Sequence, residues 1–341
     1  MSVSPPRRRS VAYVPNDTAR TVRRPHVQVG KTTLLRCVVF VATILSVALV
    51  FVVVVFHPTH QNNDRRSAGD KEWNISASSP DQTYFDIVVA VLVVGGVSKE
   101  ALEEMSRVRR VYDRYGGKVV PSGKSTPLTF RVVFVVGRSN LPPDTDVPES
   151  GLLMGDFYFV DVREGYDHLS DKTKAIMGLS EHMRFRFLVK TDGDTFPCLS
   201  QATKQLMELS AEDQALVYAG LLAQCGKVFP KGHKLHDPEF LKATGGVLDC
   251  HPMYQQGAFY ILGERVVQHL YRSRDLLTVM SVEDAMVGIW LLGINKVILD
   301  IGGSFYCKCW SHQVPREKLS FYHFCKTDEK IDKCLAKFGT C

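Results

Sequence analysis

The chain has 341 residues, of which 45% are hydrophobic and 23% are charged, and its formal net charge is +6. This composition is typical of a globular protein and excludes the collagen-like, wholly disordered and small disulfide-stapled classes. Residues 1–36 hold eight lysines and arginines and one aspartate, a charge of +7, so the remainder sums to −1. The main body of the chain is therefore not basic, and we expect no nucleic acid among its partners.

A strongly apolar segment follows this basic tail. Residues 37–56, CVVFVATILSVALVFVVVVF, contain no charge, and as a helix they would span about 30 Å, the thickness of the hydrocarbon layer of a membrane. The positive tail predicts a cytosolic N-terminus and a single-pass type II topology. The segment is long, begins after a 36-residue tail and lacks a small-x-small cleavage site, which favours an uncleaved anchor over a signal peptide.

Beyond the predicted membrane span, residues 57–83 are polar and rich in Asn, Asp and Ser, which is typical of a stem. The composition changes at Tyr84, so residues 84–341 are the predicted lumenal domain. Of two Asn-x-Ser/Thr sequons, at Asn16 and Asn74, only Asn74 would face the glycosylation machinery. Eight cysteines follow the span, and an even number in an oxidising compartment predicts disulfides whose pairing the sequence does not choose.

The predicted lumenal domain alternates buried strands with amphipathic helices. Ser98 is the expected cap of the first helix, which has Leu102 and Met105 on its apolar face and ends at Gly116. The expected elements are a strand over 85–94, this helix, a strand over 128–136, a helix over 170–182 and a strand over 185–190. This alternation predicts a mostly parallel α/β sheet that binds ligands beyond the carboxyl ends of its strands.

Two carboxylates, Asp192 and Asp194, follow the last of these strands and are separated only by Gly193. At the carboxyl end of a buried strand, both can turn toward one pocket and hold a divalent cation with hard oxygen ligands. Asp-Gly-Asp is also ordinary turn chemistry. The apolar run LVKT that precedes it favours the functional interpretation.

The segment LVKTDGDTF resembles the Lys-Thr-Asp-Asp-Asp segment of the family 31 glycosyltransferases, with Gly193 in place of the middle aspartate. These are lumenal enzymes that transfer galactose or N-acetylglucosamine from UDP. Three other segments resemble the family in the same order: the run from Gly155-Asp156 to Lys172-Thr173, YQQGAFYIL over 254–262, and VEDAMVG over 282–288. The family's Ile-Arg-x-Thr-Trp signature survives only as VRRVY over 108–112, and an upstream arginine of that signature is Met105 here.

The resemblance implies a GT-A-like α/β fold, with a Rossmann-like nucleotide-binding sheet and an acceptor-binding lobe. It implies an inverting, metal-dependent transfer of galactose or N-acetylglucosamine to a glycan hydroxyl, most often in β1,3 linkage. The expected partners are a UDP-Gal or UDP-GlcNAc donor, a glycoprotein or glycolipid acceptor, and a membrane crossed by one helix. The expected location is the Golgi membrane, with the catalytic domain in the lumen.

The resemblance also implies roles for residues on the donor side. Asp194 and Asp192 would bind Mn²⁺ or Mg²⁺ and the nucleotide. His323 in SFYHFC, where alternation places it on one face of a strand, is the expected third metal ligand, with His312 as a substitute. The alternative for His323 is a hydrogen-bonded core histidine. Arg109 and Lys172 would contact the nucleotide, although Lys172 is equally interpretable as a surface charge.

On the acceptor side, Asp284 matches the aspartate that acts as catalytic base in the family, and a partly desolvated carboxylate suits that role. Its alternative is an acid that stabilises a helix N-terminus. Glu283, Gly257 and Tyr254 are the expected acceptor-binding residues, and Glu283 is alternatively a solvated residue of the same acidic turn.

Two other functions compete with the transferase. A lumenal metal-dependent phosphohydrolase would also use Asp192 and Asp194, but it normally needs further His and Asp ligands, and no such cluster is evident in the sequence. A non-catalytic, membrane-anchored carbohydrate-binding ectodomain would have no use for a base at Asp284.

Overall fold

A mixed β-sheet forms the centre of the computed structural model, which describes residues 83–96, 98–139, 150–308, 319–339 and 341. The strands are β1 (Tyr84–Leu92), β2 (Lys118–Val119), β3 (Leu128–Gly137), β4 (Leu152–Met154), β5 (Phe157–Val160), β6 (Arg184–Asp192), β7 (Phe196–Pro197), β8 (Val217–Ala223), β9 (Gly226–Lys227), β10 (Cys250–His251), β11 (Tyr254–Gly263), β12 (Val297–Asp300) and β13 (Phe321–Tyr322). Among the described residues, nine strands form one sheet in the order β12-β8-β11-β6-β1-β3-β5-β4, with β2 paired to β3.

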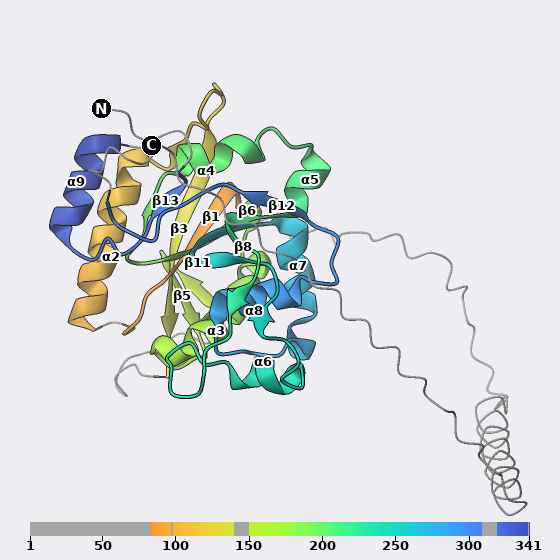
Figure 1. Ribbon diagram of the computed structural model, residues 1–341. Helices are drawn as coiled ribbons and strands as arrows, with labels where there is room; N and C mark the ends of the chain where they lie inside the picture. Colours follow the sequence, from red (N-terminus) through yellow and green to blue (C-terminus); the bar gives the residue numbers. More distant parts are fainter. Residues whose placement is uncertain (1–82, 97, 140–149, 309–318, 340) are drawn as a thin grey trace, which may run out of the picture. The chain divides into compact units, whose positions relative to one another are not determined.

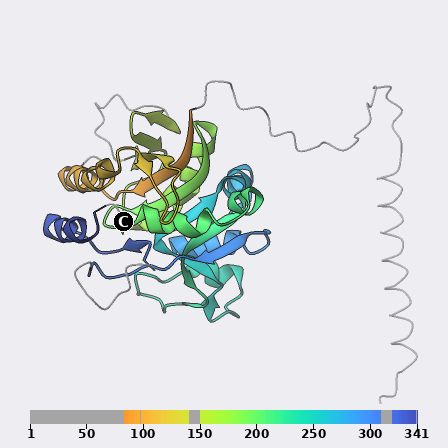
Figure 2. The same ribbon diagram turned by 90° about the horizontal axis from the view of Figure 1, so that it is seen from above.

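Helices cover both faces of this sheet (Figures 1 and 2). They are α2 (Lys99–Tyr112), α3 (Leu169–Ile176), α4 (Leu199–Leu206), α5 (Ala211–Ala215), α6 (Pro238–Ala243), α7 (Glu264–Arg272), α8 (Glu283–Trp290) and α9 (Asp328–Phe338). One core contains Val89 and Val91 of β1 together with residues of α2 and α4. The other contains Val88 and Ala90 together with residues of α3, α7 and α8. Both faces of β1 are therefore buried, as its continuous apolar run predicts.

The first expected elements are confirmed with small changes at their ends. Ser98 caps α2 by accepting a hydrogen bond from the Ala101 backbone N–H at 3.2 Å. Leu102 is not part of the packed face, because it is 46% exposed while Ala101 and Met105 contact the core. The helix expected over 170–182 is α3 followed by a 3₁₀ helix at Met177–Glu181.

The expectation of a mostly parallel sheet is wrong for the half that contains β11. Strands β1, β3, β5 and β6 are parallel, but β11 is antiparallel to both β6 and β8. The sheet is therefore mixed. An apolar strand that is buried on both faces has the same composition whichever way it runs, so the sequence pattern carried no sign of this reversal.

The C-terminal segment returns to the N-terminal half of the fold. Helix α9 lies beside α2 (Figures 1 and 2), and Arg110 forms an ion pair with Asp328 at 2.8 Å. Strand β13 pairs with β7, just after the Asp-Gly-Asp turn. Three disulfides join cysteines within the described residues, Cys198–Cys341, Cys225–Cys250 and Cys307–Cys325, which confirms the expectation of disulfides.

The predicted membrane anchor lies outside the described residues. No helix within the described residues has the length and apolarity needed to cross a bilayer. The predicted tail, the predicted span over 37–56, nearly all of the predicted stem and both sequons lie outside those residues.

Candidate active site

The candidate site lies at the carboxyl end of β6, between β1 and β11. Asp192 is in register with Leu92 of β1, while Lys190 is in register with Tyr260 of β11. The chain then turns through Gly193 and Asp194, with the Thr195 N–H donating to the Asp192 carbonyl at 3.1 Å. The turn thus opens at the edge of the sheet where parallel strands end, which is where ligands bind in such folds.

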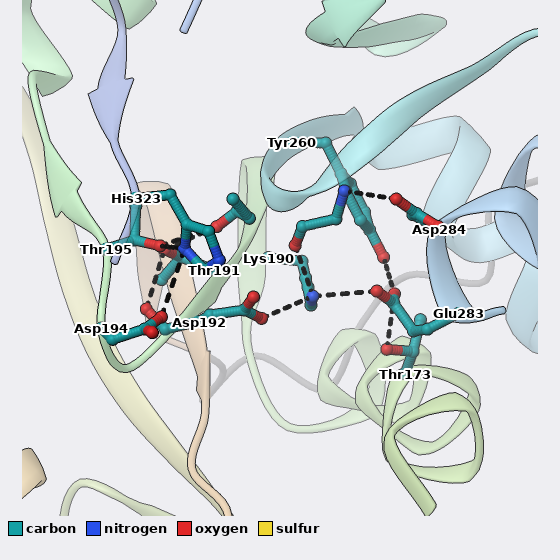
Figure 3. Close-up of polar contacts among 12 residues, drawn as sticks. Thr173, Lys190, Thr191, Asp192, Asp194, Thr195, Tyr260, Glu283, Asp284 and His323 are labelled. Atoms are coloured by element: carbon teal, nitrogen blue, oxygen red, sulfur yellow. Dashed lines mark hydrogen bonds and ion pairs between the residues drawn. The ribbon is translucent and has the colours of Figure 1, made fainter. Parts of the chain in front are cut away.

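The three expected metal ligands come together beside the Asp-Gly-Asp turn (Figure 3). Ligand atoms of Asp192, Asp194 and His323 all lie within 4.8 Å of one another. His323 Nδ1 is 3.2 Å from Asp194 Oδ1 and 3.1 Å from Thr195 Oγ1. The Cys325 N–H also donates to the Asp194 carbonyl at 2.8 Å, which fixes the C-terminal segment against the turn.

The backbone at His323 is not the extended strand that the sequence pattern predicts. It follows the two-residue strand β13, and the next residue, Phe324, has a left-handed φ of 60°. The strand face predicted from alternation does not extend to it. The substitute ligand, His312, lies outside the described residues.

Burial shifts the pKa values of both His323 and Asp194. Desolvation lowers the pKa of His323, so the imidazole is neutral at physiological pH and has a lone pair to offer. Desolvation also raises the pKa of Asp194. Two carboxylates and a neutral imidazole form a donor set that suits a divalent cation such as Mn²⁺, so these residues fit the metal that the family implies.

Lys190 connects this cluster to Glu283. Its side chain is 2% exposed, and Nζ donates to Asp192 Oδ1 at 2.8 Å, to Glu283 Oε2 at 2.9 Å and to the Gly257 carbonyl at 2.6 Å. Burial disfavours its charge, but Asp192 and Glu283 outweigh burial and raise the pKa of Lys190. The lysine is therefore a permanently charged bridge between the two acidic groups.

Glu283 is part of the interior network. Its Oε1 accepts hydrogen bonds from Thr173 Oγ1 and from the Tyr260 hydroxyl, both at 2.8 Å, and its Oε2 accepts from Lys190. Both carboxylate oxygens are thus occupied by protein groups. This geometry contradicts the alternative of a solvated first-turn acid and fits a residue that organises the acceptor side.

Asp284 lies beside Glu283, at the start of α8. Its Oδ2 accepts from the Gly257 N–H at 2.7 Å and its Oδ1 accepts from its neighbour, the Ala285 N–H, at 2.8 Å. Burial, with a further contribution from the charge of Glu283, raises the pKa of Asp284 to about 6. The carboxylate is therefore ionised at neutral pH and more basic than an ordinary aspartate.

The other expected acceptor-side residues surround Asp284. A Cβ built on Gly257 would lie 3.2 Å from Asp284 Oδ2, so the glycine lets this strand approach the carboxylate closely. Burial and the charge of Asp284 raise the pKa of Tyr254 to about 12. The structure thus places Tyr254, Gly257, Glu283 and Asp284 in one group.

The two basic residues expected at the nucleotide are engaged elsewhere. Lys172 is fully buried, and its Nζ donates to the Val93 carbonyl and to Glu164 Oε2, both at 2.7 Å. Its burial contradicts the alternative of a surface charge, because the ammonium is enclosed by protein groups. Arg109 pairs with Asp156 at 2.7 Å and lies over the Phe134 ring at 4.7 Å. Within the described part of the chain, no ion pair joins it to the cluster at β6.

Sequence reasoning missed three polar side chains that complete the network, Thr173, Thr195 and Tyr260. Thr173 and Tyr260 lie in segments that resemble the family, but nothing in the local pattern shows that both donate to Glu283. The sequence gives one signal for them, which is that they are polar residues within otherwise apolar segments. A buried hydroxyl group needs a hydrogen-bond partner, so such residues are candidates for a buried polar network.

Comparison with known proteins defines the class. A family model described as Galactosyltransferase matches residues 120–299, more than half of the chain. The chain therefore belongs to this galactosyltransferase family, which confirms the resemblance to the family 31 glycosyltransferases.

Individual relatives agree with this family. The chain is 26% identical over 242 residues to "Probable beta-1,3-galactosyltransferase 1" of Arabidopsis thaliana, covering 70% of this chain and 60% of the relative. It is 25% identical to "Beta-1,3-galactosyltransferase 6" of Mus musculus, covering 64% of this chain and 65% of the relative. The chain thus spans less than two thirds of the length of these curated relatives. A solved galactosyltransferase, LgtC in complex with donor and acceptor sugar analogs, shares 14% identity over 70% of this chain and 87% of that chain, and its TM-score of 0.36 is too low to support a conclusion.

Proposed function

We propose that the protein transfers galactose from UDP-galactose to a glycan hydroxyl, with inversion and in β1,3 linkage. Family membership and the names of the relatives favour galactose over N-acetylglucosamine as the donor sugar. The observation that carries the proposal is the arrangement around Lys190. On one side of this lysine lies the group of residues suited to bind a divalent cation, Asp192, Asp194 and His323, and on the other side lies Glu283 with the carboxylate of Asp284 beside it.

Asp192, Asp194 and His323 are the residues that would hold the divalent cation. When bound there, Mn²⁺ or Mg²⁺ would supply positive charge opposite the diphosphate that leaves with UDP. Lys190 holds the Asp192 carboxylate in place from the protein side through its 2.8 Å hydrogen bond. Its own charge is balanced by Asp192 and Glu283, so we assign it to positioning and not to phosphate binding.

Asp284 accepts the proton of the acceptor hydroxyl in this mechanism. Its pKa of about 6 leaves it ionised at neutral pH while keeping it basic enough to take a proton during attack. The Gly257 and Ala285 N–H groups hold the carboxylate in a fixed orientation. A glycan-binding ectodomain would have no need for a base in this position, and a phosphohydrolase would need a second group of metal ligands.

We also propose the setting of the reaction. The domain over 84–341, with a GT-A-like mixed sheet, would lie in the Golgi lumen behind a stem over 57–83 and a type II membrane anchor over 37–56. The charge of +7 in residues 1–36 supports this orientation. The disulfides among the described residues support an oxidising compartment.

The donor is tested by incubating the purified protein with Mn²⁺, a panel of UDP-sugars and glycan acceptors, and measuring UDP release with and without acceptor. We expect acceptor-dependent release from UDP-galactose. Release only from UDP-N-acetylglucosamine would assign the other donor. Glycan binding without UDP release would favour the binding ectodomain, and release of inorganic phosphate would favour the hydrolase.

The metal site is tested by Asp194→Asn in the same assay. Loss of one ligand charge should lower Mn²⁺-dependent turnover by roughly a hundredfold or more, since one lost electrostatic element at a transition state costs about 3 kcal/mol. Lys326 is the control, because it is exposed and lies 3.6 Å from Asp194 Oδ2. Its replacement by Gln should have a small effect. An Asp194→Asn protein that keeps full activity in a chelator would show that the cation site is wrongly placed.

A further inference from the structure

Phe324, which follows the proposed metal ligand His323, has a backbone conformation that is unusual for an aromatic residue. Its φ is 60°, and among the described residues it is the one residue other than glycine with a positive φ. In this region the Cβ crowds the backbone, so a bulky side chain costs free energy there that a glycine does not. Strain of this kind persists where the surrounding structure holds the residue, and such residues cluster at ligand-binding sites.

The residues on both sides of Phe324 are held by other segments. His323 Nδ1 lies 3.2 Å from Asp194 Oδ1, and the Cys325 N–H donates to the Asp194 carbonyl at 2.8 Å. Cys325 is also joined to Cys307 by a disulfide. These contacts explain the path of the backbone but not the side chain at position 324, because a glycine would follow the same path at a lower cost.

The ring of Phe324 lies at the edge of the proposed cation site. The residue is 42% exposed, so burial of apolar surface offsets the strain only in part. One side of the ring contacts the His323 imidazole, with 4.0 Å between the ring centroids. Lys326 Nζ lies 5.4 Å from the Phe324 ring centroid and 3.6 Å from Asp194 Oδ2. The ring therefore stands beside the Asp194–His323 contact with part of its surface open to a ligand.

The chemistry of the donor identifies the group that such a ring would contact. A cation held by Asp194 and His323 would face the diphosphate of UDP-galactose, and the galactose is bonded directly to that diphosphate. The axial 4-hydroxyl of galactose leaves several C–H groups together on one face of the sugar. This apolar face packs well on an aromatic ring, whose π face is electron-rich. The acceptor would instead meet Asp284, on the other side of Lys190.

We propose that Phe324 is a donor-contacting residue, whose ring packs against the apolar face of the galactose in UDP-galactose. The inference rests on the proposed function, which supplies the donor. Two successive residues then serve the two parts of one ligand: His323 serves the cation opposite the diphosphate, and Phe324 serves the sugar. The contact with the sugar is what the strained aromatic residue provides and a glycine would not.

Binding measurements test this contact without relying on turnover. UDP and UDP-galactose are titrated separately into the full-length protein in detergent, with Mn²⁺ and without acceptor, by isothermal titration calorimetry. UDP lacks the sugar and is the internal reference. Phe324→Ala should weaken the binding of UDP-galactose by about tenfold and that of UDP by less than about twofold. Phe324→Tyr keeps the ring and should stay within about threefold of wild type for both.

A matched control is available at the other end of the sheet. Tyr84 is also an exposed aromatic residue, at 48%, and it lies at the start of β1, whereas the candidate site lies where β1 and β6 end. Tyr84→Ala should therefore leave the affinities for UDP and for UDP-galactose unchanged. A loss of UDP-galactose affinity equal to that of Phe324→Ala would make the effect nonspecific and contradict the proposal.

Phe324→Gly separates the contact from a structural role. Glycine adopts a φ of 60° without strain, so the melting temperature of this variant without ligand should be no lower than that of wild type. Its affinity for UDP-galactose should nevertheless fall as far as that of Phe324→Ala. A ring that served only to stabilise the fold would give the opposite result, a lower melting temperature with an unchanged ratio of the two affinities.

Three results would overturn the proposal. They are wild-type affinity of Phe324→Ala for UDP-galactose, an equal loss for UDP and UDP-galactose, and unchanged donor binding with a raised KM for the acceptor. Asp194→Asn separates these failures from that of the proposed function. If wild type binds UDP-galactose in the presence of Mn²⁺ and Asp194→Asn does not, only the role of Phe324 is wrong. If wild type binds no UDP-galactose, the proposed function itself is wrong.

Discussion

Asp284 is the residue on which the proposed chemistry most depends. Asn has nearly the same shape but does not accept the hydroxyl proton, so Asp284→Asn should lower turnover by roughly 10²- to 10⁴-fold. UDP-sugar binding should change little, because the donor-side ligands are Asp192, Asp194 and His323. Turnover at saturating acceptor and melting temperature should be measured on one preparation. A stable variant that turns over within a factor of about three of wild type would remove Asp284 from the mechanism.

The same carboxylate predicts a pH dependence. Its pKa is raised from 3.8 to about 6, so the ionised base is lost as the pH falls through 6. At saturating metal, kcat/KM should decrease about tenfold per pH unit below this value. The residual activity of Asp284→Asn should not show this decrease at acidic pH. If kcat/KM of the wild-type protein instead decreased only near pH 4, the base would be an ordinary, solvated carboxylate.

Several site residues were predictable one by one, but their partners were not. Asp192, Asp194 and Asp284 were found because acidic residues followed a buried strand or opened a helix within family-like segments. Lys172 was interpreted as a nucleotide contact or a surface charge, and the bridging role of Lys190 was not predicted, since lysine is rarely buried without a partner. Their partners, such as Glu164 and Glu283, come from other elements, and only the folded chain brings them within hydrogen-bond distance.

At the scale of elements, the buried Asp237 joins the segment before α8 to helix α6 and strand β10. Asp237 is fully buried. Its Oδ1 accepts hydrogen bonds at 3.2 Å from the Ser281 N–H and from the Phe240 N–H, and by the second bond the aspartate caps the N-terminus of α6. His251 Nε2 lies 3.2 Å from the other carboxylate oxygen of Asp237. Burial opposes its ionisation, but these hydrogen bonds outweigh burial and lower its pKa.

Asp237→Ala should therefore destabilise the protein by roughly 3 kcal/mol at pH 7, because it leaves buried donors without an acceptor. Since the folded-state pKa is lowered, the stabilisation by Asp237 is present above the ordinary pKa of an aspartate and is lost as the pH falls through the folded value. Urea unfolding at pH 7 and at acidic pH measures both effects. Glu239→Ala, in the exposed first turn of α6, is the control. Equal destabilisation by the two variants would contradict the assignment.

The elements themselves were predicted to different degrees. Strand β1, helix α2 and strand β6 follow from apolar runs, a Ser cap and Gly stops, which are local signals. The direction of β11 and the end of β13 at Tyr322, just before His323, were not predicted. Both depend on pairing with distant strands, β6 and β8 in one case and β7 in the other, and that pairing leaves no local pattern.

At the scale of the whole molecule, the charge distribution predicts which sequon is modified. With +7 in residues 1–36 and −1 beyond them, Asn74 should carry a glycan in the expressed protein and Asn16 should not. Mass spectrometry of glycopeptides from the full-length protein tests this, and Asn74→Gln gives the matched control. A glycan on Asn16, or a mature chain that begins after residue 56, would contradict the type II topology.

The pairing of His323 with the Asp-Gly-Asp turn also constrains how the protein is made. Thr195 and His323 are 128 residues apart in the chain. A ribosome adds about 5–20 residues per second, so the turn waits roughly ten seconds before the imidazole that completes the cluster exists. During this interval the nascent chain carries an acidic turn without its third ligand. The proposed cation site is consequently assembled among the last features of the fold, after the central strands have been synthesised.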